Sequence, residues 1–209
     1  TNIRQNGKIA MKLNENDELV SVIPCCDKDN ILLATKLGKA IRFDVNDVRV
    51  FVGRDSSGVR GIRLKPNDTV VSMSLLPDVE KRFVLSVTEN GFGKRTPVED
   101  YRMTNRGGQG VANIECSVRN GPVVASYVAS EENQIMLVTN SGKLIRIRVH
   151  GGEGDSIRIA GRKTQGVRLF DVDEGEKVVS VALLADDEDN DDNDDINNED
   201  NQIIDNNEV

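Results

Sequence analysis

The stretch Arg54-Asp-Ser-Ser-Gly58-Val-Arg-Gly-Ile-Arg-Leu64 returns later in the chain as Arg162-Lys-Thr-Gln-Gly166-Val-Arg-Leu-Phe-Asp-Val172. In both copies an acidic residue stands ten positions after the glycine, and a Val-Val-Ser string begins two positions further on. A shorter copy, Arg106-Gly-Gly-Gln-Gly110-Val111, fits the same frame, and residues 7–21 fit it more loosely. The aligned glycines at 7, 58, 110 and 166 are 51, 52 and 56 residues apart. Self-similarity at such an interval indicates a repeat architecture.

A second element follows each of the first three glycines. Its copies are the segments 35–42, 88–95 and 139–146, which share a Thr three positions before a Gly and an Arg four positions after it. An apolar run precedes the turn and a strand pattern resumes behind it, as in Ile145, Ile147 and Val149 alternating with Arg146 and Arg148. These segments are predicted to be β-hairpins whose glycine supplies a positive φ.

About four strands per repeat, without helical periodicity, predict an all-β fold of four-stranded blades, in the propeller class. A β-sandwich is the alternative, but it has no reason to repeat its sequence at this interval. Residues 1–185 are predicted to form one domain of about three and a half to four blades, and a closed ring is expected to need a further blade from upstream sequence. The missing initiator Met suggests a fragment.

The formal charge of −8 is unevenly distributed. Residues 186–209 hold twelve Asp or Glu and no Lys or Arg, which leaves residues 1–185 with 23 acids, 27 bases and a charge of +4. The Asp/Asn-rich segment 186–209 is predicted to be disordered and to compete with DNA for the basic body. A calcium loop at 189–200 is disfavoured because Asp194 and Asp200 stand where an EF-hand requires Gly and Glu.

Signatures of enzymes, metal sites and membrane spans are missing from the sequence. We therefore predict no catalytic and no metal-binding residues in this sequence. His150 is the sole histidine, and the three cysteines do not have the spacing of metal ligands. Tyr101 and Tyr127 are interpreted as packing residues. No apolar run approaches the roughly 20 residues of a membrane helix, and no secretory signal is visible, so the cytoplasm is expected.

Basic residues recur at equivalent positions of the repeat. One Arg stands four positions before the first glycine of a unit, and another Arg stands four positions after the glycine of the hairpin turn. Equivalent positions of a bladed disc lie at equal radius, which predicts a positive rim that neutralises phosphates of any base sequence. A solvated surface of mixed charge is the alternative. The predicted DNA-binding residues are Lys8, Lys39, Arg42, Arg54, Arg60, Arg63, Lys94, Arg95, Arg106, Lys143, Arg146, Arg162, Lys163 and Arg168.

The strings at 58–64, 90–96 and 161–167, with the acidic C-terminal segment, resemble the C-terminal DNA-wrapping domain of the A subunit of bacterial DNA gyrase, a type IIA topoisomerase. The resemblance covers about residues 1–185 and implies a β-pinwheel whose basic rim wraps duplex DNA. It implies two protein partners, the gyrase B subunit and the N-terminal part of the A subunit. ATP and Mg would be used on those other domains, with no cofactor in this chain.

Two features of the family are missing, the gyrase box and the cleavage domain with its tyrosine. The segment 105–110 is only a degenerate relative of that box. The chain alone is therefore expected neither to cleave DNA nor to support full supercoiling. Alternatives are the matching domain of topoisomerase IV, or a protein-binding propeller.

Overall fold

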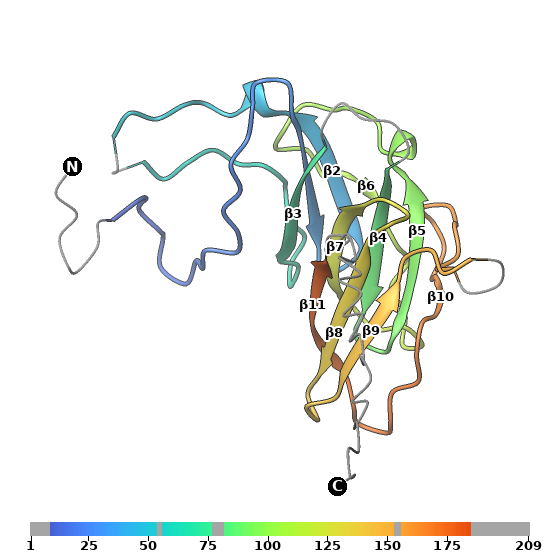
Figure 1. Ribbon diagram of the computed structural model, residues 1–209. Coiled ribbons are helices and arrows are strands. Elements are labelled where there is room, and N and C mark those ends of the chain that lie inside the picture. The colour runs from blue at the N-terminus through green and yellow to red at the C-terminus, as the bar shows by residue number, and fades with distance from the viewer. Residues whose placement is uncertain (1–8, 54–55, 77–81, 153–155, 185–209) are drawn as a thin grey trace, which may run out of the picture.

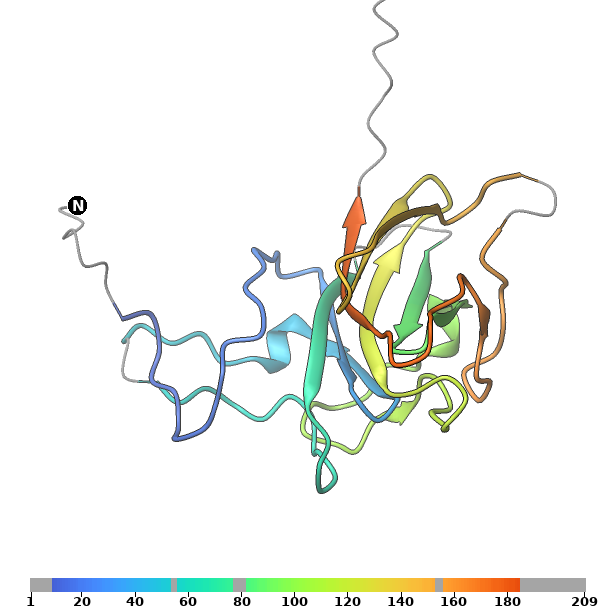
Figure 2. The same ribbon diagram turned by 90° about the horizontal axis from the view of Figure 1, so that it is seen from below.

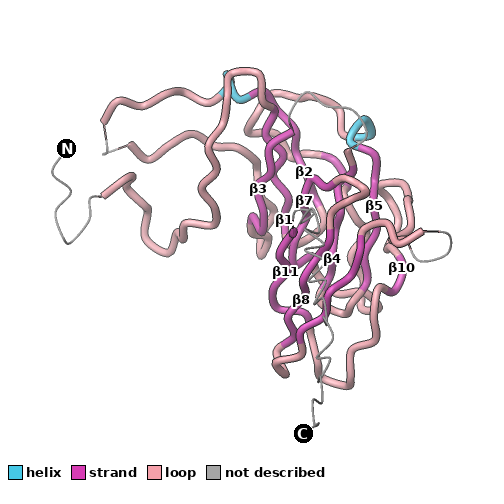
Figure 3. The backbone as a smooth tube through the Cα atoms, in the orientation of Figure 1, coloured by secondary structure: helices cyan, strands magenta, loops and turns pink. Residues whose placement is uncertain are grey.

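The computed structural model describes residues 9–53, 56–76, 82–152 and 156–184. In these residues the regular structure is almost entirely strand, and the two helical turns are short 3₁₀ segments, Val45–Asp47 and Val98–Asp100 (Figure 3). The strands form three antiparallel sheets standing side by side (Figure 1). The predicted all-β bladed fold is thus confirmed.

Each sheet is built on one of the three predicted hairpins. The hairpin strands are β1 (Asn30–Thr35) with β2 (Lys39–Asp44), β4 (Phe83–Thr88) with β5 (Phe92–Pro97), and β8 (Gln134–Thr139) with β9 (Leu144–Arg148). Their turn glycines, Gly38, Gly91 and Gly142, have φ of 78°, 77° and 84°, a region that L-residues with a side chain avoid. The turn positions identified from the sequence are therefore the ones that the backbone requires.

One long strand closes the inner edge of each sheet. These strands are β3 (Val70–Leu76), β7 (Val123–Ala129) and β11 (Val178–Leu184), which pair antiparallel with β1, β4 and β8. Side-chain hydrogen bonds join neighbouring inner strands: Ser72 Oγ donates to Ser126 O at 2.8 Å, and Tyr127 Oη donates to Val181 O at 2.7 Å. The inner strands thereby hold the three sheets against one another.

The fourth strand of a blade comes from the next repeat unit along the chain. Strand β6 (Val111–Ala112) pairs with β2, and β10 (Val167–Arg168) pairs with β5, so the sheet orders are β3-β1-β2-β6 and β7-β4-β5-β10. The third sheet, β11-β8-β9, has three strands among the described residues. A repeat unit is therefore not a blade, because each unit contributes its outer strand to the blade before it.

The buried core runs between the sheets. Its largest cluster joins Leu85 and Val87 of β4 to Ile135 and Leu137 of β8, all at most 1% exposed. By contrast, the described residues 9–29 form no strand, although they match the repeat loosely. Ile9 and Val22 there are 74% and 76% exposed, since none of the described hairpins pairs with this segment.

Candidate nucleic-acid interface

Three connecting segments, residues 58–64, 101–112 and 157–168, supply the outer strands or their counterparts in each unit; we call them the outer belt. Strands β6 and β10 belong to it and lie at the outer edges of their sheets (Figure 1). The outer belt contains eight Lys or Arg and no Asp or Glu. Its basic residues are Arg60, Arg63, Arg102, Arg106, Arg158, Arg162, Lys163 and Arg168. All of these except Arg102 and Arg158 are among the DNA-binding residues predicted from the sequence.

Two of the recurring arginines brace neighbouring blades with their side chains. Arg106 donates from Nη1 to Arg60 O at 3.2 Å and from Nε to Asp47 O at 2.7 Å. Arg162 donates from Nη1 to Ala112 O at 3.1 Å, the equivalent carbonyl one unit later. The recurrence of these arginines therefore has a structural cause, apart from any contact with DNA.

The three arginines behind the hairpin turns differ in exposure. Arg146 is exposed, while Arg42 is half-buried and donates to Asn30 Oδ1 and Tyr101 O, both at 3.4 Å. Arg95 is 3% exposed: its Nε donates to Ile157 O at 2.6 Å, its Nη1 meets Glu131 at 3.3 Å, and its guanidinium lies over the Phe83 ring. Equivalent positions thus share a place in the blade but not an exposed charge.

Lys94 lies wholly inside the second blade, where the other two hairpins carry Ile41 and Ile145. Its Nζ donates to Gly161 O at 2.5 Å. Burial, with a smaller contribution from the nearby Arg162 charge, lowers the pKa of Lys94 from 10.5 to about 8. The structure therefore places Lys94, like Arg95, in the interior and not on the predicted rim.

Two other predicted cations are exposed but paired with acids. Lys143 Nζ lies 2.8 Å from Glu176 and 2.5 Å from Asp173, and Arg168 pairs with Asp171. Lys39 is half-buried, and Lys8 and Arg54 lie outside the described residues, as does the acidic segment 186–209. The remaining predicted residues, all exposed, are Arg60, Arg63, Arg146 and Lys163.

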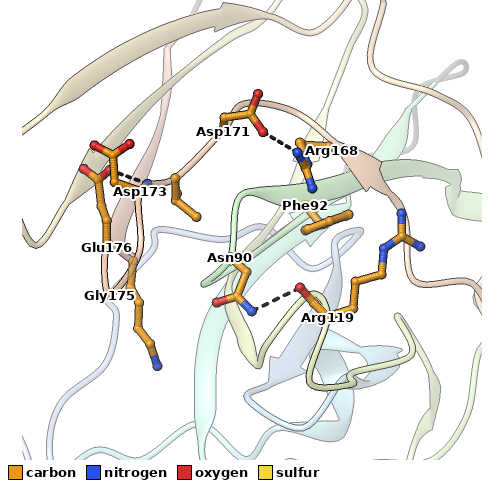
Figure 4. Close-up of a pocket in the computed structure, with 10 residues that line it drawn as sticks. Asn90, Phe92, Arg119, Arg168, Asp171, Asp173, Gly175 and Glu176 are labelled. Atoms are coloured by element: carbon orange, nitrogen blue, oxygen red, sulfur yellow. Dashed lines mark hydrogen bonds and ion pairs between the residues drawn. The ribbon is translucent and has the colours of Figure 1, made fainter.

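Arg119 was not among the residues predicted from the sequence, because it lies outside the outer belt and off the repeat frame. Its guanidinium lies 4.8 Å from the centre of the Phe92 ring, and that of Arg168 lies 5.5 Å from the same ring. The three side chains line a cavity of about 300 Å³ together with acids of the 171–176 loop (Figure 4). Asn90 Nδ2 holds the Arg119 backbone by donating to its carbonyl at 3.1 Å. Exposed Arg102, Arg148 and Arg158 were missed as well.

Carboxylates gather instead around the hairpin turns. Glu176 accepts hydrogen bonds from Lys143 Nζ, from Ser141 Oγ and from Thr139 Oγ1 at 2.6 Å, which together hold its pKa well below the usual range. Asp68, its equivalent in the first blade, accepts from Thr35 Oγ1 at 2.8 Å. The repeat's acidic position thus fixes the turns, and these acids lie outside the belt.

The interpretation of the tyrosines as packing residues agrees with their surroundings. Tyr101 is 1% exposed and donates to Asn113 Oδ1 at 2.6 Å, and burial raises the pKa of both Tyr101 and Tyr127. Within the described residues no three His, Cys, Asp or Glu side chains lie close enough together to hold a metal ion. In the same part of the chain no helix has the length and apolarity to cross a membrane.

Interlocked antiparallel blades, two of them four-stranded and one three-stranded among the described residues, together with a basic outer edge define a propeller-class repeat protein with a cationic surface. The model of the family described as "DNA gyrase C-terminal domain, beta-propeller" matches residues 2–26, 29–77, 82–121 and 133–185. The chain belongs to this family, which confirms the resemblance drawn from the sequence.

Individual relatives agree with this assignment. The A subunit of the Rickettsia felis DNA gyrase is 41% identical over 229 residues, covering 88% of this chain and 25% of the relative. The chain thus spans about a quarter of the curated relatives that it matches. The solved structure of a DNA gyrase A C-terminal domain superposes with a TM-score of 0.74 at 28% identity, covering 87% of this chain and 59% of that one. The C-terminal domain of a DNA topoisomerase IV gives a TM-score of 0.73 at 26% identity, covering 82% and 52%.

Proposed function

We propose that this chain binds duplex DNA along the outer belt without reading its sequence, and bends the duplex around the blades as the wrapping domain of a gyrase A subunit. The observation that carries the proposal is the composition of the belt, eight cations and no acid in three segments drawn from three successive repeat units. Neutralising phosphates releases condensed counterions, so affinity from such a surface does not depend on base sequence.

Bending requires contacts spread over an arc. Smooth bending of a site of 20–30 base pairs costs about 1–6 kcal/mol, which several phosphate contacts can offset. The cations of the belt lie on segments at the outer edges of successive blades. Each blade would therefore contact the next stretch of the duplex. Arg119 adds a cation near the outer strand β10, where it would extend the surface beyond the belt.

The parts implied for the complete enzyme belong to the same proposal. The B subunit and the remainder of the A subunit would be the protein partners, ATP and Mg would be used on those parts, and the setting would be the bacterial cytoplasm at the nucleoid. The chain itself would supply the handling of DNA and no chemistry. A role in topoisomerase IV is the second candidate, because that solved domain superposes nearly as well.

Duplex binding across a salt series tests the proposal. The informative variant carries Arg63→Gln, Arg158→Gln and Lys163→Gln, three exposed belt residues. Its control carries Lys28→Gln, Lys36→Gln and Lys65→Gln, which remove the same charge from exposed positions off the belt.

The slope of log K against log salt should fall by about 0.9 for each phosphate contact removed, so by up to about 2.7 in the belt variant. The control should keep a slope close to that of the unaltered chain. Equal losses in the two variants would refute the belt as the binding surface, leaving a general charge effect.

A further inference from the structure

The hairpin turn of the second blade differs in charge from the other two turns. Directly after the turn glycine, the first and third blades carry Lys39 and Lys143, whereas the second blade carries Phe92. The acid that stands two positions before the inner strand in the first and third units is replaced by Gly121 in the second unit. The second turn therefore lacks both the lysine and the carboxylate that the other two turns contain.

Arg119 supplies a cation to the second turn instead. Its guanidinium lies 4.8 Å from the centre of the Phe92 ring, and the guanidinium of Arg168, on strand β10, lies 5.5 Å from the same point. Both side chains lie beside this ring at the edge of the cavity (Figure 4). An arginine that stacks on an aromatic ring keeps the N–H groups of its edge available for hydrogen bonds to an anion. The ring therefore positions two guanidiniums at one place.

The loop that carries Arg119 is fixed by hydrogen bonds from two sides. Asn90 Nδ2, on the hairpin turn, donates to the carbonyls of Val118 and Arg119, both at 3.1 Å. Asn120 is fully buried, and its Nδ2 donates to Gln165 O at 3.1 Å. Seen from below, this yellow-green loop lies beside the orange segment that leads into β10 (Figure 2). A loop that is already ordered loses little conformational freedom when a ligand binds, so binding costs less entropy.

The two arginines differ in their present partners. Arg168 pairs with Asp171, but both side chains are well exposed, at 60% and 80%, and an ion pair of this kind contributes little. The other two acids that line the cavity are paired with Lys143. In the part of the chain that the structure describes, no acid forms an ion pair with Arg119. An anion that binds both guanidiniums can therefore displace Asp171.

We propose that Arg119 and Arg168 bind neighbouring phosphates of one strand of duplex DNA at the turn of the second blade, and that Asp171 pairs with Arg168 until a phosphate displaces it. The inference rests on the proposed function, because Arg168 belongs to the outer belt along which the duplex lies. Both guanidiniums lie within 5.5 Å of one ring centre, and the phosphates of a strand follow one another at about 3.4 Å along the helix axis. Arginine also binds a phosphate through two parallel hydrogen bonds.

The site determines where the duplex extends beyond the belt. The carboxylates at the first and third turns repel phosphates, whereas the acid of the second turn, Glu89, is paired with Lys177 at 3.0 Å. Arg119 is exposed on the loop beside that turn. The DNA backbone therefore passes from the belt onto the turn of the second blade and stays clear of the other two described turns.

Duplex binding by the full chain across a salt series tests the site. Arg119→Gln should lower the slope of log K against log salt by about 0.9, the value of one phosphate contact. Its far-UV circular dichroism spectrum should not change, because the side chain is exposed. Arg119→Lys keeps the charge and should keep most of the slope. Arg49→Gln is the matched control: this exposed guanidinium lies 5.3 Å from the centre of the Phe51 ring, off the belt, and its loss should leave the slope unchanged.

Removing the internal competitor should have the opposite effect. Asp171→Asn frees Arg168 and should tighten duplex binding at low salt by up to about fivefold, the equivalent of one exposed ion pair. Asp27→Asn removes one exposed acid away from the belt and is the control for a general change of charge. Equal gains in affinity from the two variants would show that Asp171 does not compete with phosphate.

The triple variant at Arg63, Arg158 and Lys163 separates this inference from the proposed function. If the triple variant loses slope while Arg119→Gln keeps it, the belt binds DNA and the phosphate site at the second turn is refuted. Equal losses from Arg119→Gln and Arg49→Gln would refute the site as well. If the chain binds no duplex even at low salt, the proposed function fails and this inference fails with it. Competition by inorganic phosphate at constant ionic strength, seen with the unaltered chain but not with Arg119→Gln, would identify a site for a free anion and overturn the assignment to DNA.

Discussion

Replacing Lys94 by Met should stabilise the protein at neutral pH and change how stability depends on pH. The side chain is 0% exposed at a position that is Ile in both other hairpins, so Met fits the site, and Gly161 O, on an exposed residue, can accept from water instead. Below pH 8 Lys94 is charged in the folded and unfolded states alike, and the cost of burying the charge is fully present. As pH rises from about 8 to 10.5 the folded state loses this proton first, so stability increases.

The fall of the pKa from 10.5 to about 8 corresponds to about 3 kcal/mol at 1.36 kcal/mol per pH unit. Because solvent near exposed Gly161 screens the charge, we expect the buried charge to lower the free energy of unfolding by about 2 kcal/mol. Urea unfolding followed by far-UV circular dichroism suits this chain, which has no Trp. The advantage of Lys94→Met over the unaltered chain should shrink by about that amount between pH 8 and 10.5.

An exposed lysine provides the control. Lys163→Met removes a charge close to Gly161 in sequence and should show no such convergence. The reasoning would be refuted if Lys94→Met were clearly less stable at pH 7, or if its difference from the unaltered chain stayed constant up to pH 10.5.

Three further outcomes are expected. Gly166→Ala should lower the free energy of unfolding clearly more than Gly142→Ala. Both glycines have a positive φ, which costs a residue with a side chain roughly 1–2 kcal/mol, but only a Cβ on Gly166 would meet a carbonyl oxygen, that of Gly93 at 2.6 Å. Equal losses of stability in urea unfolding would contradict this expectation. Glu176→Gln should lower the Tm at pH 7, because a carboxyl group with a depressed native pKa stabilises the fold fully above its unfolded pKa. That stabilisation is lost as the pH falls through the native pKa, so the difference in Tm should shrink in acid, and a difference that persists there would count against the hydrogen-bond network. Deleting residues 186–209 should tighten duplex binding at low salt by removing twelve competing acids, and unchanged affinity would exclude that competition.

The hairpins could be predicted because their signals are local. A glycine at positive φ and an alternating strand behind it act within a few residues, as at Gly142 and Arg146. The interlocking of blades could not, since β6 pairs with a hairpin about seventy residues earlier and carries only two paired residues. The repeat interval indicated the number of strands per unit but not which sheet each strand enters.

The basic site was only partly predictable, because residue type does not reveal what the side chain faces. Arg106 and Arg162 donate to backbone carbonyls about fifty residues away, and no pattern of side chains in the sequence predicts such contacts. Lys94 occupies an interior position, although its charge favours an exposed one. Arg119 was missed because it stands outside the repeat frame, although Phe92, the ring it covers, was part of a recognised string.

Bending of DNA by the outer belt can be measured as end-to-end energy transfer across a short duplex. A duplex of about 40 base pairs, well below the roughly 150 base pair persistence length, is nearly straight when free. A saturating concentration of the chain should raise the energy transfer between dyes at the two ends of the duplex. The triple variant at Arg63, Arg158 and Lys163 should raise this transfer much less, at a concentration that gives equal occupancy of the duplex. Binding without any change in transfer, or an equal change with the triple variant, would show that the outer belt does not bend the duplex.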